Sequence, residues 1–202
     1  MILNRMVNQE RKMIMKNFRA KRLNKKASST KNSPDKVIES IELKPGQTIA
    51  DIGSGGGYFS QRFAELVGEE GKVYAVDTDP GYLEFVKKSV KEKGLNNVIP
   101  TLATEDRLDL AKEGLDFIFM RNVTHHLEDR VGYFKNLKDF LKPDGRIIII
   151  DYKPARSFSF HRIFGHFLPR EIITQELDEA GYLLEKEFDF LPEQHFMIYS
   201  KR

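Results

Sequence analysis

The pattern of hydrophobic and polar positions changes near residue 33. Before it, Lys and Arg are frequent, Gly and Pro are absent, and the apolar residues fall on one helical stripe. That stripe consists of Leu3, Val7, Ile14 and Phe18. After residue 33, short apolar runs alternate with longer amphipathic segments, as strands alternate with helices. We therefore predict a basic N-terminal extension over 1–31, helical or disordered, and a folded domain over 32–202.

The folded domain shows five strand-like runs separated by helical segments, and then two further strand-like runs. The expected strands are 48–52, 72–76, 98–100, 115–120 and 146–150, followed by a hairpin of 183–191 and 195–200. Two helices are expected to start at Pro34, capped by Ser33, and at Pro80. Three more are expected over 59–67, 130–141 and 170–180. A Lys-Pro-Asp-Gly turn is expected at 142–145. This order predicts an α/β fold: a three-layer, Rossmann-like, doubly wound sheet, mostly parallel, of seven strands with a C-terminal antiparallel hairpin.

Composition narrows the classes of function. The 202 residues include 33 Lys+Arg and 30 Asp+Glu, but residues 1–36 alone carry a net charge of +9. The remainder is mildly acidic and offers no basic footprint for nucleic acid. Cysteine is absent, which removes thiolate chemistry and fits a cytoplasmic location. The longest apolar run, 147–150, is too short to span a membrane, and no secretory signal is visible.

A glycine-rich loop carries the clearest chemical signal. Four of the five residues 53–57 are glycine, between a predicted buried strand and a predicted helix. Glycine is needed where the backbone takes positive φ or lies against a ligand. The dinucleotide pattern fails because Tyr58 and Ser60 stand where its third glycine belongs, and no Gly-Lys-Ser/Thr follows. Asp51 just before the loop disfavours a diphosphate and favours a cationic ligand.

The motif Asp51-x-Gly53-x-Gly55-x-Gly57 resembles the signature of class I S-adenosylmethionine-dependent methyltransferases. The resemblance extends over residues 34–202. Further similar segments are Lys44–Gly46, Val76-Asp77, Thr104–Asp106, His125–Asp129 and Leu141–Gly145. The resemblance implies S-adenosylmethionine as cofactor, S-adenosylhomocysteine as product and methyl transfer as the reaction.

The resemblance also implies a set of cofactor-binding residues at the carboxyl edge of the sheet. Asp51 is expected to hold the ammonium group and Asp77 to accept both ribose hydroxyls. Glu105 or Asp106 is expected to accept the adenine amino group, or instead to stabilise a helix N-terminus. Asp79, rather than Asp77, is expected to cap the helix that follows. The expected set is Asp51, Gly53, Ser54, Gly55, Gly57, Asp77, Thr78, Thr104, Glu105, Asp106, Arg121 and Asn122.

Catalytic residues are harder to predict in this class. Methyl transfer from a sulfonium is an in-line displacement, so the protein mainly aligns donor and acceptor. A base is required only where the acceptor must lose a proton. The candidates are His125, His166 and Asp151, with lining or capping of the cofactor pocket as the other role of His125. No pattern at metal-ligand spacing is convincing, so we expect no metal.

The acceptor is predicted only by class. Arg121–Thr124 departs from the Asn/Asp-Pro-Pro-Tyr/Phe segment of nucleic-acid base methylases. A small, partly apolar acceptor is favoured by four phenylalanines in the segment after the fifth strand: Phe158, Phe160, Phe164 and Phe167. The alternatives are an RNA or protein methyltransferase that uses the basic N-terminal segment, and a non-catalytic S-adenosylmethionine-binding protein. The oligomeric state is not predicted.

Overall fold

The computed structural model describes the chain except residues 1, 105–107, 109 and 155–166, and describes only the backbone of 2–10 and 12. Seven strands form a mixed sheet in the order β3-β2-β1-β4-β5-β7-β6. The chain divides into two compact units: the first comprises 1–46 and 54–109, the second 47–53 and 110–202. The predicted Rossmann-like class, with a mostly parallel sheet and a C-terminal antiparallel hairpin, is confirmed.

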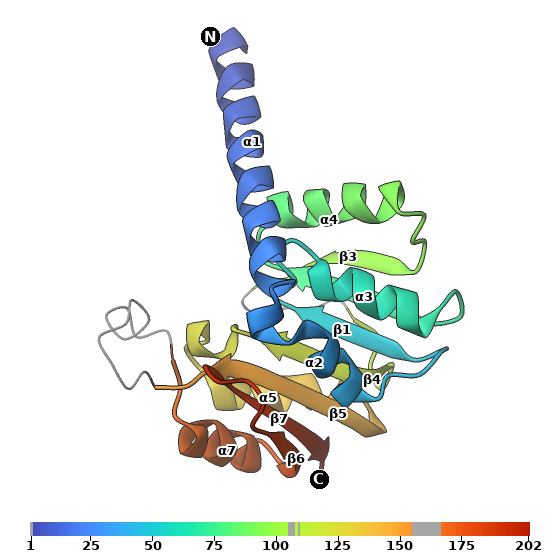
Figure 1. Cartoon of the computed structure of the whole chain (residues 1–202), viewed down its shortest axis with the longest axis vertical. Helices are drawn as coiled ribbons and strands as arrows, with labels where there is room; N and C mark the ends of the chain where they lie inside the picture. Colours follow the sequence, from blue (N-terminus) through green and yellow to red (C-terminus); the bar gives the residue numbers. More distant parts are fainter. Residues whose placement is uncertain (1, 105–107, 109, 155–166) are drawn as a thin grey trace. The chain divides into compact units, whose positions relative to one another are not determined.

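The first unit is built from helices around two parallel strands. Its elements are α1 (Ile2–Ala27), η1 (Thr30–Asn32), α2 (Pro34–Ile41), α3 (Tyr58–Val67), β2 (Lys72–Asp77), α4 (Pro80–Glu92) and β3 (Val98–Leu102). Helices α3 and α4 pack on the strands through buried apolar side chains such as Phe63 and Val86. Helix α1 packs in turn on α3 and α4, and its N-terminal half extends beyond α4 (Figure 1).

Helix starts in this unit follow the predicted proline positions. Pro34 and Pro80 both occupy the first turn of a helix, where the missing N–H costs nothing. Asp79 caps α4 as predicted, because its side chain accepts a hydrogen bond from the amide of Gly81 at 2.8 Å. The predicted cap at Ser33 is wrong: its backbone is left-handed (φ 42°) and its side chain makes no cap bond. A capping side chain normally needs extended backbone at that position.

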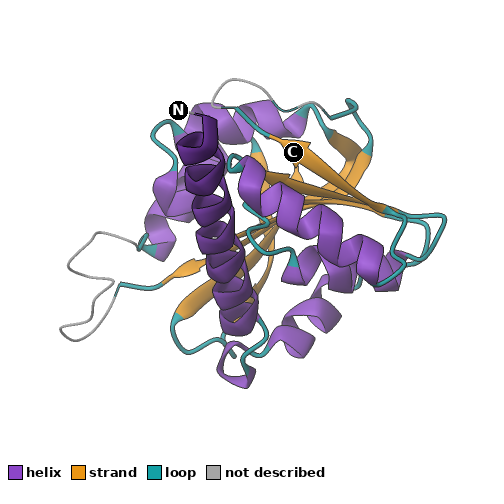
Figure 2. Cartoon of the chain, turned by 90° about the horizontal axis from the view of Figure 1, so that it is seen from above, coloured by secondary structure: helices purple, strands orange, loops and turns teal. Residues whose placement is uncertain are grey.

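The second unit carries the remaining strands. Its elements are β1 (Thr48–Ile52), β4 (Leu115–Arg121), η2 (Thr124–His126), α5 (Arg130–Lys138), β5 (Leu141–Tyr152), α7 (Arg170–Glu179), β6 (Tyr182–Phe188) and β7 (Gln194–Lys201). β1, β4 and β5 run parallel, whereas β7 is antiparallel to both β5 and β6. The strands (orange in Figure 2) fan out, as the twist between neighbouring strands requires. The all-isoleucine stretch 147–150 is fully buried.

The start of β5 differs from the prediction. The strand begins at Leu141 instead of 146, and α5 ends at Lys138 instead of 141. Leu115 of β4 pairs with Leu141 and Phe117 pairs with Arg146, so the expected turn at 142–145 is a bulge inside the strand. Sequence pattern missed this because proline and glycine signal a turn whether or not pairing resumes on both sides of it.

Candidate functional site

The glycine loop is hydrogen-bonded onto the carboxyl end of β2 in the first unit. The amide of Ser54 donates to the carbonyl of Val76 at 3.0 Å. The amide of Gly55 donates to Oδ2 of Asp77 at 2.8 Å, and Gly57 closes a turn onto the Ser54 carbonyl. Gly55 takes φ 54°, a left-handed conformation that glycine adopts without strain. The structure thus brings together Ser54, Gly55, Gly57 and Asp77 of the predicted set.

Asp77 is a half-buried carboxylate that receives backbone amides. Besides Gly55 on Oδ2, it accepts the amide of Asp79 on Oδ1 at 3.0 Å. Burial raises the pKa of Asp77 above 3.8, although these amide bonds favour the charged form. Each carboxylate oxygen has two lone pairs, so both oxygens keep capacity for a further donor. A vicinal diol matches that capacity.

Ser54 shows that the loop fits a polar ligand. Its hydroxyl oxygen is buried and has no hydrogen-bond partner among the described residues. Leaving a buried hydroxyl without a partner costs free energy that a ligand's polar atom would recover. Together with the two amide-bound oxygens of Asp77, this hydroxyl fits the ribose and amino-acid end of S-adenosylmethionine.

Helix α1 contacts this loop, which the sequence did not predict. The side-chain amide of Asn24 donates to the carbonyl of Gly56 at 2.7 Å. A Cβ at Gly56 would lie only 2.4 Å from the carbonyl oxygen of Ala20, so this glycine is required by the helix. Lys16 pairs with Asp79 at 2.5 Å. Burial disfavours the charged form of Asp79, but the bonds from Lys16 and Gly81 outweigh it and lower its pKa below 3.8.

In the second unit, Arg121 and Asn122 end β4 in a shared network. Gln194 at the start of β7 accepts from Arg121 Nη2 at 3.0 Å and donates to Asn122 Oδ1 at 2.5 Å. Asn122 has φ 57°, which its short polar side chain tolerates. Gln194 was missed because only the antiparallel pairing of Tyr152 with Gln194 brings it here.

A buried carboxylate with several hydrogen-bond partners lies at the end of β5. Asp151 is 0% exposed, and its Oδ1 lies 2.6 Å from Nδ1 of His125. The other oxygen accepts the hydroxyl of Thr124 and the amide of His125, and Tyr152 donates its amide to Oδ1. This contact fixes the orientation of the imidazole ring through Nδ1. The structure therefore pairs two of the three predicted catalytic candidates, and Thr124 is an addition.

The remaining predicted residues do not converge as clearly. Asp51 is buried at the end of β1, and Gly53 packs so closely that a Cβ would lie 2.3 Å from Val123. Thr78 and Thr104 are exposed. Residues predicted on sequence grounds that lie outside the described part of the chain are Glu105, Asp106, His166, Phe158, Phe160 and Phe164.

The described residues form neither a metal site nor a membrane-spanning helix. No group of three or more His, Asp or Glu side chains there is arranged to hold a metal ion. In the same part of the chain, none of the helices combines the length and the apolar character that crossing a membrane requires.

The fold and the loop geometry define a Rossmann-like methyltransferase architecture, and comparison with known proteins agrees. A family model described as a methyltransferase domain matches residues 43–187. The chain belongs to this methyltransferase domain family.

Individual relatives are more distant. The ubiquinone/menaquinone biosynthesis C-methyltransferase of Shewanella sp. (strain W3-18-1) is 24% identical over 156 residues, 74% of this chain and 62% of the relative. The chain thus spans less than two thirds of the length of such relatives. A SAM-dependent methyltransferase from Aquifex aeolicus superposes with a TM-score of 0.83 at 26% identity, covering 92% of this chain and 98% of that one. A putative methyltransferase from Bacillus halodurans, at 15% identity and a TM-score of 0.68, covers 83% and 97%.

Proposed function

We propose that this chain transfers a methyl group from S-adenosylmethionine to a small-molecule acceptor. The observation that carries the proposal is the bond from the Gly55 amide to Asp77, which couples the glycine loop to the predicted ribose-binding carboxylate in a chain of the methyltransferase family. The relatives named for quinone biosynthesis suggest an aromatic acceptor with an acidic hydroxyl.

Each unit supplies its own residues to this function. Asp77 binds the ribose hydroxyls, the hydroxyl of Ser54 binds a polar atom of the cofactor, and Asp51 binds the ammonium group. Arg121 and Asn122 remain candidates through the network at the end of β4. When bound, S-adenosylmethionine supplies a methyl group already activated by its sulfonium. The adenine contacts of Thr104, Glu105 and Asp106 and a role for His166 stay predictions.

The buried pair in the second unit handles the proton. Asp151 orients His125 through Nδ1, and the ring accepts a proton from the acceptor. The proton would come from the acceptor hydroxyl, which leaves an oxyanion, and bound S-adenosylmethionine would supply the activated methyl group for that oxygen. Because Asp151 also accepts from Thr124 and two backbone amides, it holds the ring in one orientation.

The proposed function is tested by turnover and ligand binding together. The chain is incubated with S-adenosylmethionine and a panel of phenols and hydroquinones, and release of S-adenosylhomocysteine is measured. S-adenosylmethionine or its product should also raise the melting temperature by mass action, and NAD should not. A shift with NAD and none with S-adenosylmethionine would overturn the proposal.

The cellular location and the class of acceptor are also proposed. A cytoplasmic location is compatible with a chain that has no cysteine. The relatives favour a small-molecule acceptor over an RNA or protein acceptor held by the basic N-terminal segment. Reversing the exposed cations Arg11 and Arg22 distinguishes the two and keeps the bond from Asn24 to the loop, because methylation of a small acceptor should persist and methylation of RNA should be lost.

A further inference from the structure

Helix α1 has a packed face and an outward face, which the helical repeat places on opposite sides. One face packs on its own unit: Ala20 is fully buried, Asn24 bonds the Gly56 carbonyl and Lys16 pairs with Asp79. These residues are spaced by four positions, so they lie on one side of the helix. The docked face fixes which residues of α1 point outward.

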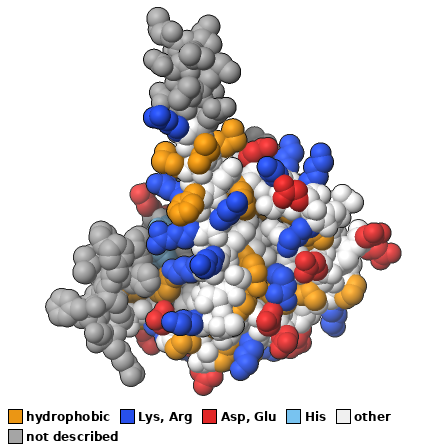
Figure 3. Space-filling model, turned by 45° about the horizontal axis from the view of Figure 1, so that its top comes forward, with side chains coloured by type: hydrophobic (Ala, Val, Ile, Leu, Met, Phe, Trp, Pro, Cys, Tyr) orange, Lys and Arg blue, Asp and Glu red, His pale blue; other side chains and the backbone are white. Residues whose placement is uncertain are grey.

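The outward face combines large apolar side chains with cations. Ile14 and Phe18, one turn apart, are 67% and 69% exposed, and Met15 beside them is 57% exposed. Arg11 and Arg22 extend the same stripe and are exposed as well. Figure 3 shows hydrophobic and basic side chains following one another along the described part of α1. This surface, defined by these five residues, is the α1 outer face.

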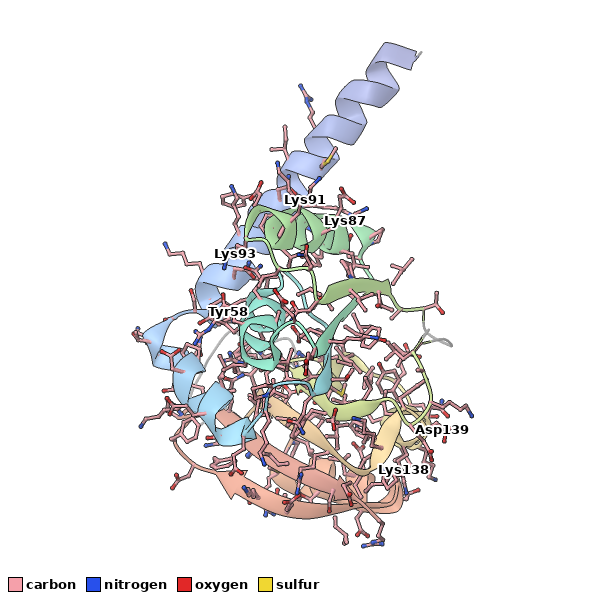
Figure 4. All side chains as sticks on the ribbon, turned by 90° about the vertical axis from the view of Figure 1, so that its right-hand side faces the viewer. Tyr58, Lys87, Lys91, Lys93, Lys138 and Asp139 are labelled. Carbon is pink, nitrogen blue, oxygen red and sulfur yellow. The ribbon has the colours of Figure 1, made fainter. Side chains whose placement is uncertain are left out.

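The charge on this part of the chain has one sign. Nine Lys or Arg and no Asp or Glu occur in residues 11–31. Helix α4, on which α1 packs, carries the exposed lysines Lys87 and Lys91 (Figure 4) and also the exposed acids Glu84 and Glu92, so the single sign of charge is confined to residues 11–31. A second copy that presented its own α1 to this face would bring like charge, so self-association through paired α1 helices is disfavoured.

We propose that the α1 outer face docks on an anionic lipid bilayer. Exposed apolar side chains between cations are the arrangement that inserts at the boundary of headgroups and acyl chains. The cations then lie at the level of the lipid phosphates. A polyanion without an apolar layer, such as RNA, would leave Ile14 and Met15 in water. The bilayer is therefore the partner that uses both features of the face.

Cosedimentation of the full chain with vesicles tests the proposal. Vesicles that contain phosphatidylglycerol should bind the chain, pure phosphatidylcholine vesicles should bind it weakly, and added salt should reduce binding. The double variant Ile14→Ser/Phe18→Ser should lower the partition coefficient by about tenfold or more, since two apolar side chains lose their burial. The matched control is Leu66→Ser/Leu102→Ser, which changes two exposed apolar residues outside α1 and should bind as wild type.

Charge reversal tests the second feature of the face. Arg11→Glu/Arg22→Glu should reduce binding to phosphatidylglycerol vesicles by more than about tenfold. Lys72→Glu/Lys135→Glu changes net charge equally at exposed positions on β2 and α5 and should have little effect. All four variants change exposed residues, so their melting temperatures should match wild type. Equal binding by the α1 variants and their controls would overturn the proposal. So would RNA binding that survives Ile14→Ser/Phe18→Ser in a chain that ignores vesicles.

Discussion

Two carboxylates at the ends of β2 and β5 show how similar positions acquire different tasks. Asp77 in the first unit is half-buried and accepts the backbone amides of Gly55 on Oδ2 and Asp79 on Oδ1. Asp151 in the second unit is fully buried and also accepts hydrogen bonds from the side chains of Thr124 and His125. The first therefore keeps acceptor capacity for a ligand, whereas the second is committed to positioning the imidazole.

In the proposed function, Asp77 serves binding of the cofactor and Asp151 serves the chemistry. Removing a carboxylate that grips the cofactor should change affinity, while neutralising one that orients a base should change the rate at constant affinity. The predictions below use this separation, from the largest expected effect to the smallest.

The largest effect is expected for Asp151→Asn. The amide keeps the size of the side chain but loses the charged oxygen that orients His125. We expect kcat to fall about 10²–10⁴-fold, the usual contribution of a positioned acid or base. The affinity for S-adenosylmethionine should be unchanged. Steady-state kinetics over a range of pH measure this, and the limb of the profile that reports the base should disappear.

Thr124→Val is the control for that variant. It removes the hydroxyl that Asp151 accepts but leaves the bond to His125, so the pH profile should keep its shape. An Asp151→Asn enzyme with wild-type kcat on an acceptor that must lose a proton would show that the pair is structural.

The next effect concerns Asp77→Ala. If Asp77 binds both ribose hydroxyls, its removal costs two charge-assisted hydrogen bonds of roughly 1.5–3 kcal/mol each. Cofactor affinity measured by calorimetry should fall at least about tenfold, with Asp77→Asn in between.

Asp79→Ala is the matched neighbour. It removes the cap of α4 and the partner of Lys16, so it should cost about 1 kcal/mol of stability with little change in affinity. Equal losses of affinity at the two positions would mean that the ribose carboxylate is misassigned.

A pH dependence follows from the burial of Asp77. Its pKa is raised above 3.8, so protonation begins at a less acidic pH than for an exposed aspartate. The charged form is the better acceptor for hydroxyl donors; cofactor affinity should therefore be full above this pKa and decline as pH falls through it. Titrations across the acidic range should show the decline in wild type and a flatter curve in Asp77→Asn. Identical curves would remove Asp77 as the titrating group.

The smallest effect is expected where α1 meets the loop. Asn24→Ala removes one bond to the Gly56 carbonyl and should cost about 1 kcal/mol, measurable as a lower melting temperature. Asn17→Ala on the same helix is the control, since no described bond to the loop involves it. Because alanine is the better helix former, Asn17→Ala should not lower stability, and a loss as large as for Asn24→Ala would show that the loop contact does not decide the result.

Local pattern predicted most elements but not their long-range partners. The strand 48–52, the helix start at Pro80 and the cap at Asp79 depend on a few adjacent residues, and all three are confirmed. Asn24 lies 32 positions before its partner Gly56, and Gln194 reaches Asn122 only through the β5–β7 register. Such contacts depend on tertiary packing, which sequence periodicity does not encode.

The most direct test of the central claim is a nuclear magnetic resonance titration of the isotopically labelled chain with S-adenosylhomocysteine. We predict that the amide signals of Ser54, Gly55 and Asp79 shift most among assigned backbone amides. The amides of Gly55 and Asp79 bond the carboxylate that binds the ribose, and Ser54 is the neighbour of Gly55. NAD at the same concentration should leave them in place. Unchanged signals at these amides with S-adenosylhomocysteine, or equal shifts with NAD, would contradict the assignment of the loop as the cofactor site.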